Sequence, residues 1–209
     1  MLQIRQFSKS YGDHLVLAIE DVSIPPGVHW VKGDNGSGKT TLFKSLAGII
    51  PCLGEITLHS ITANKEPLAY RKLVTFSEAE PQFPDFLTAK DLVRFVGKTR
   101  GSTPDEQDLL CRRMGVDLYF NKSCGTHSSG MLKKLSLALA FLGKPKLIIL
   151  DEPLVTLDEL SRKILLGMIV EKSQDPSMTF LLSSHQSIDP ALLLVNQTFC
   201  IRNKTLERV

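Results

Sequence analysis

The sequence lacks most features of a secreted or membrane-embedded protein. Its four cysteines lie far apart and form no CxxC pair, so neither a disulfide framework nor a zinc site is expected from Cys52, Cys111, Cys124 and Cys200. The longest apolar runs, such as LIIL and ALLLV, are much shorter than a membrane span. The opening residues MLQIRQFSKSYGDH contain no apolar signal core. We therefore expect a soluble, cytosolic chain.

A strong charge of either sign is also missing. The net charge is +3, and the basic residues are scattered along the chain rather than gathered in runs. This pattern does not predict a nucleic-acid partner. With 209 residues, of which 43% are hydrophobic and 22% charged, the composition is that of an ordinary globular protein. We expect one domain covering residues 1–209.

A glycine-rich loop, GDNGSGKTT, stands at residues 33–41. Gly33, Gly38, Lys39 and Thr40 fill the phosphate-loop pattern of glycine, four free positions and Gly-Lys-Ser/Thr. HWVKG before the loop predicts a strand and KTTLFKSLAG after it predicts a helix, so phosphates would meet a helix N-terminus. Lys39 is expected to reach the terminal phosphates, and the Thr40 hydroxyl to ligate Mg²⁺. The other loop residues predicted to bind the nucleotide are Asn35, Gly36, Ser37 and Thr41.

A second phosphate-site signal is KLIILDEP, residues 146–153. Four apolar residues predict a buried strand, and two carboxylates follow at its C-terminal end, where parallel α/β sheets bind ligands. Asp151 is a candidate ligand of Mg²⁺. Glu152 is a candidate catalytic base that orients and deprotonates a water molecule aimed at the γ-phosphate.

The rest of the chain alternates predicted strands and helices. LQIRQF and VLAIEDVSI are predicted strands before the phosphate loop, and GEITLHSI, RKLVTFS and MTFLLSS are predicted strands after it. The polar segment at about 85–125 has a helical pattern, with Thr103 as a candidate N-cap, and a further helix is predicted at 128–143. This alternation indicates an α/β fold with a parallel sheet covered on both faces, and a helical subdomain.

Taken together, these motifs resemble the ATP-binding subunit of an ATP-binding-cassette (ABC) transporter over nearly the whole chain. Tyr11, in KSYGDH, falls where that family places an aromatic ring on adenine. Asp158, which ends VTLD, matches the loop that communicates across the dimer. His185, after FLLSS, matches the histidine that contacts the γ-phosphate and is a candidate catalytic residue. The order of these residues relative to the two phosphate motifs is more specific than any one of them.

The family's signature, Leu-Ser-Gly-Gly-Gln, is present in altered form as HSSGM, residues 127–131. The resemblance implies that Ser128 and Gly130 close over the ATP bound by the other subunit, and the same Ser128 is a good N-cap for the helix that follows. His127, Ser129 and Met131 depart from the family pattern. The SxGM version resembles ATPase subunits of exporters that have a separate membrane subunit.

A second departure concerns the family's glutamine that links Mg²⁺ and the attacking water to the membrane subunit. Glu78 is the residue expected there, and Gln82 lies too late in the sequence. Glu78 is therefore a candidate metal ligand that adds a negative charge beside the γ-phosphate. Just after it, Phe83 and Phe86 stand among prolines. They either form the groove in which the family receives a helix of the membrane subunit, or pack the lobe onto the core.

The resemblance implies a P-loop NTPase core with a mixed, mainly parallel sheet, an N-terminal antiparallel β layer and a helical subdomain. It implies ATP hydrolysis with Mg²⁺, a homodimer or a heterodimer of related subunits, and a membrane-spanning permease that carries the cargo. The chain would then lie in the cytoplasm, peripheral to the inner face of the cell membrane. The altered signature favours export over import.

Three alternative functions remain open. A small P-loop kinase is similar in size, but it lacks HSSGM before LDEP, and its phosphate loop usually lies nearer the N-terminus. A soluble ABC ATPase that acts on DNA or ribosomes carries long coiled-coil insertions or two cassettes, and neither is visible here. A nucleotide-binding regulatory subunit that hydrolyses ATP poorly is favoured by Glu78 and the altered signature, whereas Lys39, Glu152 and His185 argue against it.

Overall fold

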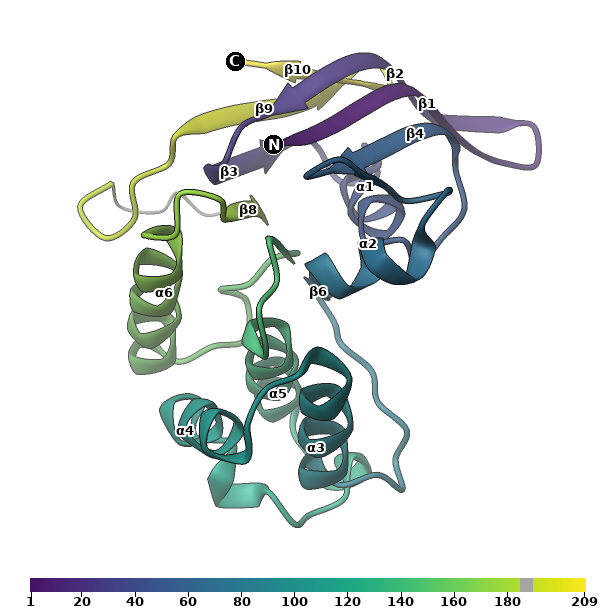
Figure 1. Ribbon diagram of the computed structural model, residues 1–209. Coiled ribbons are helices and arrows are strands. Elements are labelled where there is room, and N and C mark those ends of the chain that lie inside the picture. The colour runs from purple at the N-terminus through teal and green to yellow at the C-terminus, as the bar shows by residue number, and fades with distance from the viewer. Residues whose placement is uncertain (185–189) are drawn as a thin grey trace.

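The computed structural model describes residues 1–184 and 190–209. Its N-terminal part forms an antiparallel sheet above the rest of the molecule (Figure 1). The strand order is β2-β1-β4-β5, and the strands are β1 (Leu2–Tyr11), β2 (His14–Ile24), β4 (Leu53–Leu58) and β5 (Ile61–Thr62). This sheet confirms the predicted N-terminal antiparallel layer.

The central sheet is mixed and mainly parallel, as the sequence predicts. Its order is β10-β9-β3-β8-β7-β6, and only β10 and β9 pair antiparallel. The strands are β3 (Gly27–Lys32), β6 (Val74–Ser77), β7 (Leu147–Leu150), β8 (Thr179–Ser183), β9 (Gln197–Arg202) and β10 (Thr205–Arg208). The carboxyl ends of β3, β6, β7 and β8 therefore point the same way, which places the phosphate loop and LDEP at one edge of the sheet.

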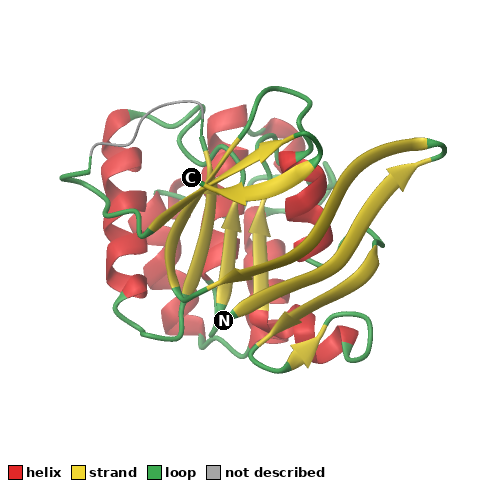
Figure 2. Cartoon of the chain, turned by 90° about the horizontal axis from the view of Figure 1, so that it is seen from above, coloured by secondary structure: helices red, strands yellow, loops and turns green. Residues whose placement is uncertain are grey.

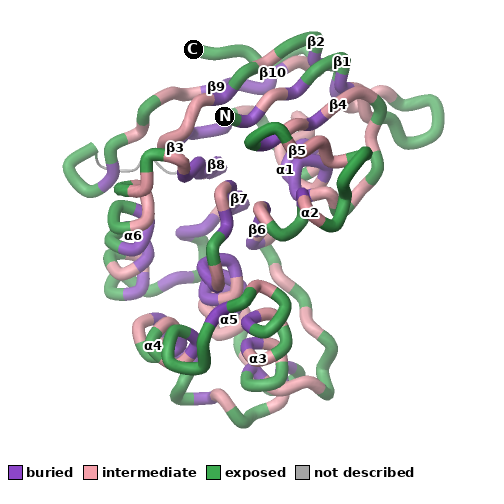
Figure 3. Tube along the Cα trace, in the orientation of Figure 1, coloured by how far each residue is buried: buried purple, intermediate pink, exposed green. Residues whose placement is uncertain are grey.

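Both faces of the central sheet are covered, because alternate residues of β7 enter different apolar clusters. Leu147 and Ile149 pack with α1 (Lys39–Leu46) and the antiparallel sheet. Ile148 and Leu150 pack with α5 (Ser129–Phe141), α6 (Glu159–Ser173) and the helical lobe. In Figure 3 the central strands are buried along their length and the outer helix faces are exposed. The unbroken run LIIL follows from this two-sided burial.

The helical lobe lies at the opposite end of the molecule from the antiparallel sheet (Figure 1). It contains α3 (Ala89–Arg100), α4 (Pro104–Met114) and the short 3₁₀ helices η1 (Asp117–Tyr119) and η2 (Cys124–Thr126). Thr88 and Thr103 each form a capping box with the acidic residue three positions later, which confirms the predicted cap at Thr103. Gly101 and Gly115 end the two helices with left-handed backbones, at φ 67° and 69°.

Two boundaries differ from the sequence prediction, and one hairpin is additional to it. β1 and β2 continue through SKSYGDH, so only Gly12 and Asp13 form the turn of a long hairpin that projects from the body of the molecule (Figure 2). The residues RKL belong to α2 (Pro67–Leu73), because Pro67 starts a helix there and only VTFS forms the strand. The hairpin β9–β10 was not predicted, because its turn at Asn203 and Lys204 has no glycine although both residues have positive φ.

None of the helices in the described part of the chain is both long enough and apolar enough to span a bilayer.

Candidate functional site

The phosphate loop connects β3 to α1 and is shaped by glycine. Gly36 and Gly38 have φ values of 78° and 103°, a region that residues with a Cβ rarely adopt. At Gly38 a Cβ would also lie 3.1 Å from the side chains of Val16 and Leu17 on β2. Gly38 is the N-cap of α1 and offers no side chain, so the first N–H groups of the helix remain available to an anion.

Lys39 is held by the loop itself. Its Nζ donates hydrogen bonds to the carbonyl oxygens of Gly33 at 2.7 Å and Asp34 at 3.0 Å. The ammonium group therefore lies across the base of the loop, beside the cavity that the loop encloses. Such a group can exchange backbone carbonyls for phosphate oxygens without a large change in position.

Asp151 connects the phosphate loop to the strand that ends beside it. The buried carboxylate accepts hydrogen bonds from the Thr40 hydroxyl, at 2.6 Å, and from the Ser183 hydroxyl, at 2.5 Å. Ser183 Oγ in turn accepts a hydrogen bond from the N–H of Glu152 at 2.9 Å. Thr40 of α1, Asp151 directly after β7 and Ser183 of β8 are widely separated in sequence and are thus joined at the carboxyl edge of the sheet, as the parallel topology requires.

These groups line a cavity of about 420 Å³. The residues around it are His14, Val16, Asn35, Gly36, Gly38, Lys39, Thr40, Thr41, Ala79, Asp151 and Glu152. Most of the predicted phosphate-binding residues, together with the predicted catalytic base, therefore surround one space. The volume falls in the range of small-molecule sites. Gly33 and Ser37 belong to the same loop but do not line the space.

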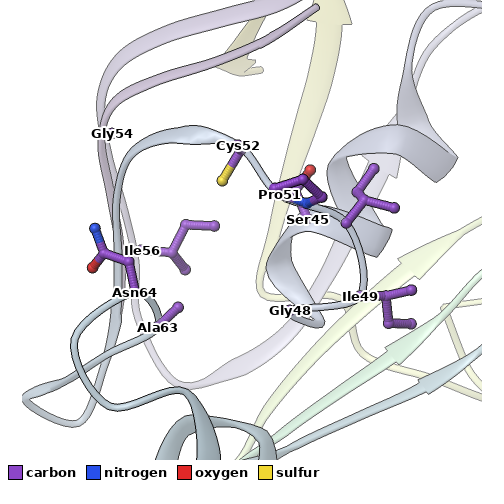
Figure 4. Close-up of a pocket in the computed structure, with 10 residues that line it drawn as sticks. Ser45, Gly48, Ile49, Pro51, Cys52, Gly54, Ile56, Ala63 and Asn64 are labelled. Carbon is purple, nitrogen blue, oxygen red and sulfur yellow. The ribbon is translucent and has the colours of Figure 1, made fainter. Parts of the chain in front are cut away.

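A second cavity, of about 360 Å³, lies between the end of α1 and the β4–β5 hairpin (Figure 4). Ile49 and Pro51 come from the segment after α1, and Ile56 and Ala63 lie on the opposite side. No charged side chain lines this cavity. It therefore offers nothing to neutralise a phosphate, and the cavity at the phosphate loop is the better nucleotide site.

Glu78 does not line the phosphate-loop cavity. Its carboxylate forms an ion pair with Lys44 of α1 at 3.1 Å, and the neighbouring Ala79, rather than Glu78, lines the phosphate-loop cavity. This geometry does not support the assignment of Glu78 as a metal ligand. The negative charge of Glu78, which was expected beside the γ-phosphate, is instead paired with the partly exposed Lys44.

Ser128, Gly130 and Asp158 lie together, but outside this cavity. Ser128 caps α5 by accepting a hydrogen bond from Met131 N–H at 3.3 Å. Asp158 caps α6 and also accepts a hydrogen bond from Lys134 of α5 at 2.7 Å. The bonds from Lys134 and Ser161 hold the pKa of Asp158 well below its usual value. A Cβ at Gly130 would lie 3.1 Å from the carbonyl oxygen of Thr156, so the start of α5 packs closely on the loop after Glu152.

Tyr11 does not line the cavity. Tyr11 is 54% exposed at the end of β1, with Lys9 Nζ 4.7 Å from its ring centroid. His14 and Val16 of β2 line the cavity instead. His185 lies outside the residues that the structure describes.

Sequence reasoning missed Lys133. This side chain is fully buried, with an exposed fraction of 0%, and its Nζ donates to the carbonyl oxygens of Glu78, Ala79 and Asp151. Burial lowers the pKa of Lys133 to about 8, against the opposing effect of nearby carboxylates. The burial of Lys133 could have been predicted from helical spacing. It lies three residues before Ser136 and four before Leu137, which places it on the buried face of α5.

Comparison with known proteins identifies the family. The sequence pattern of the family described as ABC transporter matches residues 21–155, which is more than half of the chain. The chain belongs to the ABC transporter family. An ABC ATPase subunit hydrolyses ATP, and this chain has the fold, the phosphate loop and the acidic strand end of such a subunit.

Two relatives and one solved structure illustrate the range of similarity. The cytochrome c biogenesis ATP-binding export protein CcmA of Legionella pneumophila is 32% identical over 195 residues, covering 90% of this chain and 94% of that protein. The glucosylceramide transporter ABCA12 of Mus musculus is 31% identical over 196 residues, and the match covers 88% of this chain but 8% of that protein. A dimeric, post-hydrolysis ATP-binding cassette bound to ADP and Pi superposes with a TM-score of 0.80 at 17% identity, covering 100% and 97% of the two chains.

Proposed function

We propose that this ABC ATPase subunit binds ATP and Mg²⁺ in the phosphate-loop cavity and powers export through a separate membrane-spanning permease. The observation that carries the proposal is the contact of Thr40 Oγ1 with Asp151 Oδ2 at 2.6 Å, beside Lys39 and Glu152. It brings a hydroxyl from the phosphate loop and a carboxylate from the buried strand to one point. A small P-loop kinase would also have such a pair, but the family match excludes that alternative.

The residues at this point fit Mg²⁺. This ion prefers oxygen ligands and is usually held by one or two carboxylates together with phosphate oxygens of the substrate. The Thr40 hydroxyl and the Asp151 carboxylate supply two protein oxygens. When bound, the ion would neutralise negative charge on the phosphates. Glu78 is not included among its ligands in this proposal, because its carboxylate is paired with Lys44.

Catalysis in this proposal consists of positioning and charge stabilisation by the chain's own residues. Lys39 transfers its hydrogen bonds from Gly33 and Asp34 to the phosphates, and the N–H groups of the loop and the start of α1 bind the remaining oxygens. Glu152 accepts a proton from the attacking water. We assign contact with the γ-phosphate to His185 and stacking on adenine to Tyr11, by resemblance to the family.

We further propose that two copies associate head to tail, with Ser128 and Gly130 of one closing over the nucleotide of the other. The position of these residues outside their own cavity, at the capped start of α5, supports this arrangement. Asp158, beside them, contacts the partner in the same interface. A related ATPase subunit could replace the second copy. Residues 1–209 then act as a single ATPase domain, with about 85–125 as its helical subdomain.

The membrane partner places the chain at the inner face of the cell membrane, on the cytoplasmic side. The export direction is supported by the SxGM form of the signature and by the similarity to an ATP-binding export protein. A soluble ABC ATPase is not favoured, since the family match and the export protein of Legionella pneumophila both point to transporter subunits. A poorly hydrolysing regulatory subunit is not favoured, since Glu152 lines the cavity beside Lys39.

Two substitutions test the proposed site. Lys39→Ala should weaken the binding of ATP with Mg²⁺ at least tenfold in calorimetric titration, because it removes the charge at the base of the loop, and the melting temperature should stay within about 3 °C. Glu152→Gln should keep ATP affinity and lower kcat by about 10²–10⁴-fold. The closed, ATP-bound dimer should then accumulate in size-exclusion chromatography.

Matched controls come from α6, where Lys163 and Glu159 form an exposed ion pair. Lys163→Ala and Glu159→Gln should leave affinity and kcat unchanged. Wild-type affinity in Lys39→Ala would show that the loop is not the nucleotide site. An unchanged kcat in Glu152→Gln, or the absence of an ATP-dependent dimer, would contradict the role of Glu152.

A further inference from the structure

The ammonium group of Lys133 lies behind the nucleotide cavity and joins the two segments that form its wall. It donates to the carbonyl oxygen of Asp151 at 2.8 Å on one side, and to those of Glu78 at 2.6 Å and Ala79 at 3.2 Å on the other. All three of its protons therefore have acceptors. A lysine that is fully buried loses its hydration, and it is retained only where such acceptors replace the water. An apolar residue would fill the same space in α5 without that cost.

The peptide group between Asp151 and Glu152 is held on both sides. Its C=O accepts from Lys133 Nζ, and its N–H donates to Ser183 Oγ at 2.9 Å. The residue that follows this peptide, Glu152, has a φ of 46°, in the left-handed region that a glutamate seldom occupies. A conformation of this kind persists only where the surrounding structure fixes it, and here the two hydrogen bonds fix the adjoining peptide plane.

We propose that Lys133 is a positioning residue for ATP hydrolysis, which holds the Asp151–Glu152 peptide so that the Glu152 carboxylate faces the attacking water. This inference rests on the proposed role of Glu152 as the base. Lys133 touches neither substrate nor water in this role. Without it, Glu152 relaxes toward an ordinary backbone conformation and its carboxylate leaves the productive position, while Lys39, Thr40 and the loop still bind ATP.

The same lysine connects the catalytic carboxylate to the start of α5. Ser128 and Gly130 lie within two turns of Lys133 on one helix, and the three carbonyl bonds tie that helix to the cavity wall. When α5 shifts as the subunit closes over the partner's nucleotide, Lys133 moves with it. The hydrogen bond from Lys133 to the Asp151 carbonyl oxygen then moves the Asp151–Glu152 peptide. The three protons of Lys133 all go to Glu78, Ala79 and Asp151 and none to the phosphate loop, so this connection acts on hydrolysis rather than on ATP affinity.

The test is Lys133→Met, which keeps the length and apolar stem of the side chain and removes the ammonium. We expect kcat at saturating ATP and Mg²⁺ to fall at least tenfold, with the ATP dissociation constant changed less than threefold. Lys133→Arg, which keeps the charge and the donors, should recover part of kcat. Lys172→Met is the matched control, because Lys172 also donates to two backbone carbonyls, of Phe141 and Gly143, at the far end of α5. It should leave kcat unchanged even if it lowers the melting temperature.

A double substitution separates positioning from general destabilisation. In a Glu152→Gln background, Lys133→Met should reduce the residual rate no further, since the group that it positions is already gone. An additive loss in that background, or a wild-type kcat in the single variant, would overturn the inference. If Lys133→Met does not fold, Ser183→Ala tests the other hydrogen bond of the same peptide, and a wild-type kcat there would also overturn it. A wild-type protein that hydrolyses no ATP would instead refute the proposed function, and the inference with it.

Discussion

Phe86 offers the sharpest test of the proposed membrane partner. It lies in the segment that runs from β6 along the side of the molecule to α3 (Figure 1), and its side chain is 81% exposed. Phe83, in the same segment, packs instead against the core cluster beneath the helical lobe. The two rings, for which the sequence left docking and packing open, therefore have different environments. Only Phe86 is free to contact a partner.

The exposed fraction of Phe86 sets how much its substitution should change stability and docking. A phenylalanine has about 200 Å² of surface, so the buried fifth of Phe86 stabilises the fold by about 1 kcal/mol at most. Docking could bury the remaining 160 Å² or so, for an upper limit of about 4 kcal/mol. Phe86→Asp should thus barely change the free energy of unfolding but weaken association with the permease by about 2–4 kcal/mol, or roughly 30- to 1000-fold. Phe83→Asp should destabilise the fold itself.

The assay is fractionation of cells that express the tagged chain, with the amount in the membrane fraction compared between variants. Urea unfolding of the purified proteins gives their stabilities. Leu118→Asp is the matched control, because Leu118 is 82% exposed on η1, elsewhere on the lobe. A folded Phe86→Asp protein that remains with the membrane as fully as wild type would place the docking surface elsewhere. If the wild type never enters the membrane fraction, the permease partner itself is refuted.

Two further predictions concern binding and stability. Tyr11→Ala should lower ATP affinity without changing kcat at saturation, since stacking on adenine is ground-state binding, and equal affinities in calorimetry would contradict that role. Burial lowers the pKa of His29, so the folded chain binds a proton there less readily than the unfolded chain, whose histidine titrates near pH 6.5. The free energy of unfolding should therefore fall as the pH drops through that value, and it should fall less in His29→Leu. Urea unfolding at about pH 7 and pH 5.5 gives this loss for each protein, and an equal loss in the wild type and the variant would refute the prediction.

Sequence spacing could predict those parts of the site that are formed by residues close together in the chain. The glycines of the phosphate loop, Lys39 and Thr40 are fixed by a short strand–loop–helix unit, and Asp151 and Glu152 follow a buried strand that is recognisable by itself. Their meeting in one cavity follows from the parallel topology. The fold class was predictable for the same reason, because alternating strands and helices leave few other arrangements.

What sequence reasoning did not reach depends on contacts between distant segments. Counting residues could not reveal that Glu78 turns toward Lys44 while Ala79 lines the cavity, because that choice depends on how α1 packs beside β6. The role of Lys133 depends on three carbonyls from two other segments. Phe83 is packed and Phe86 is exposed because of how the helical lobe packs beside them. The segment that carries both rings is irregular, so its sequence has no periodicity from which the buried ring could be predicted.

The strand order has a consequence for how the chain assembles as it is synthesised. The antiparallel pairs β1–β2 and β1–β4 are complete once residue 58 has emerged, so this layer can form early. By contrast, β3 precedes the phosphate loop and pairs only with β8 and β9. Of these two strands β8 comes first in the chain, and it begins at residue 179. At about 5–20 residues per second, β3 waits roughly 10–30 s on the ribosome for its neighbours. The nucleotide cavity therefore forms only after β8 has been synthesised, and ATP can stabilise only chains that extend at least to residue 183.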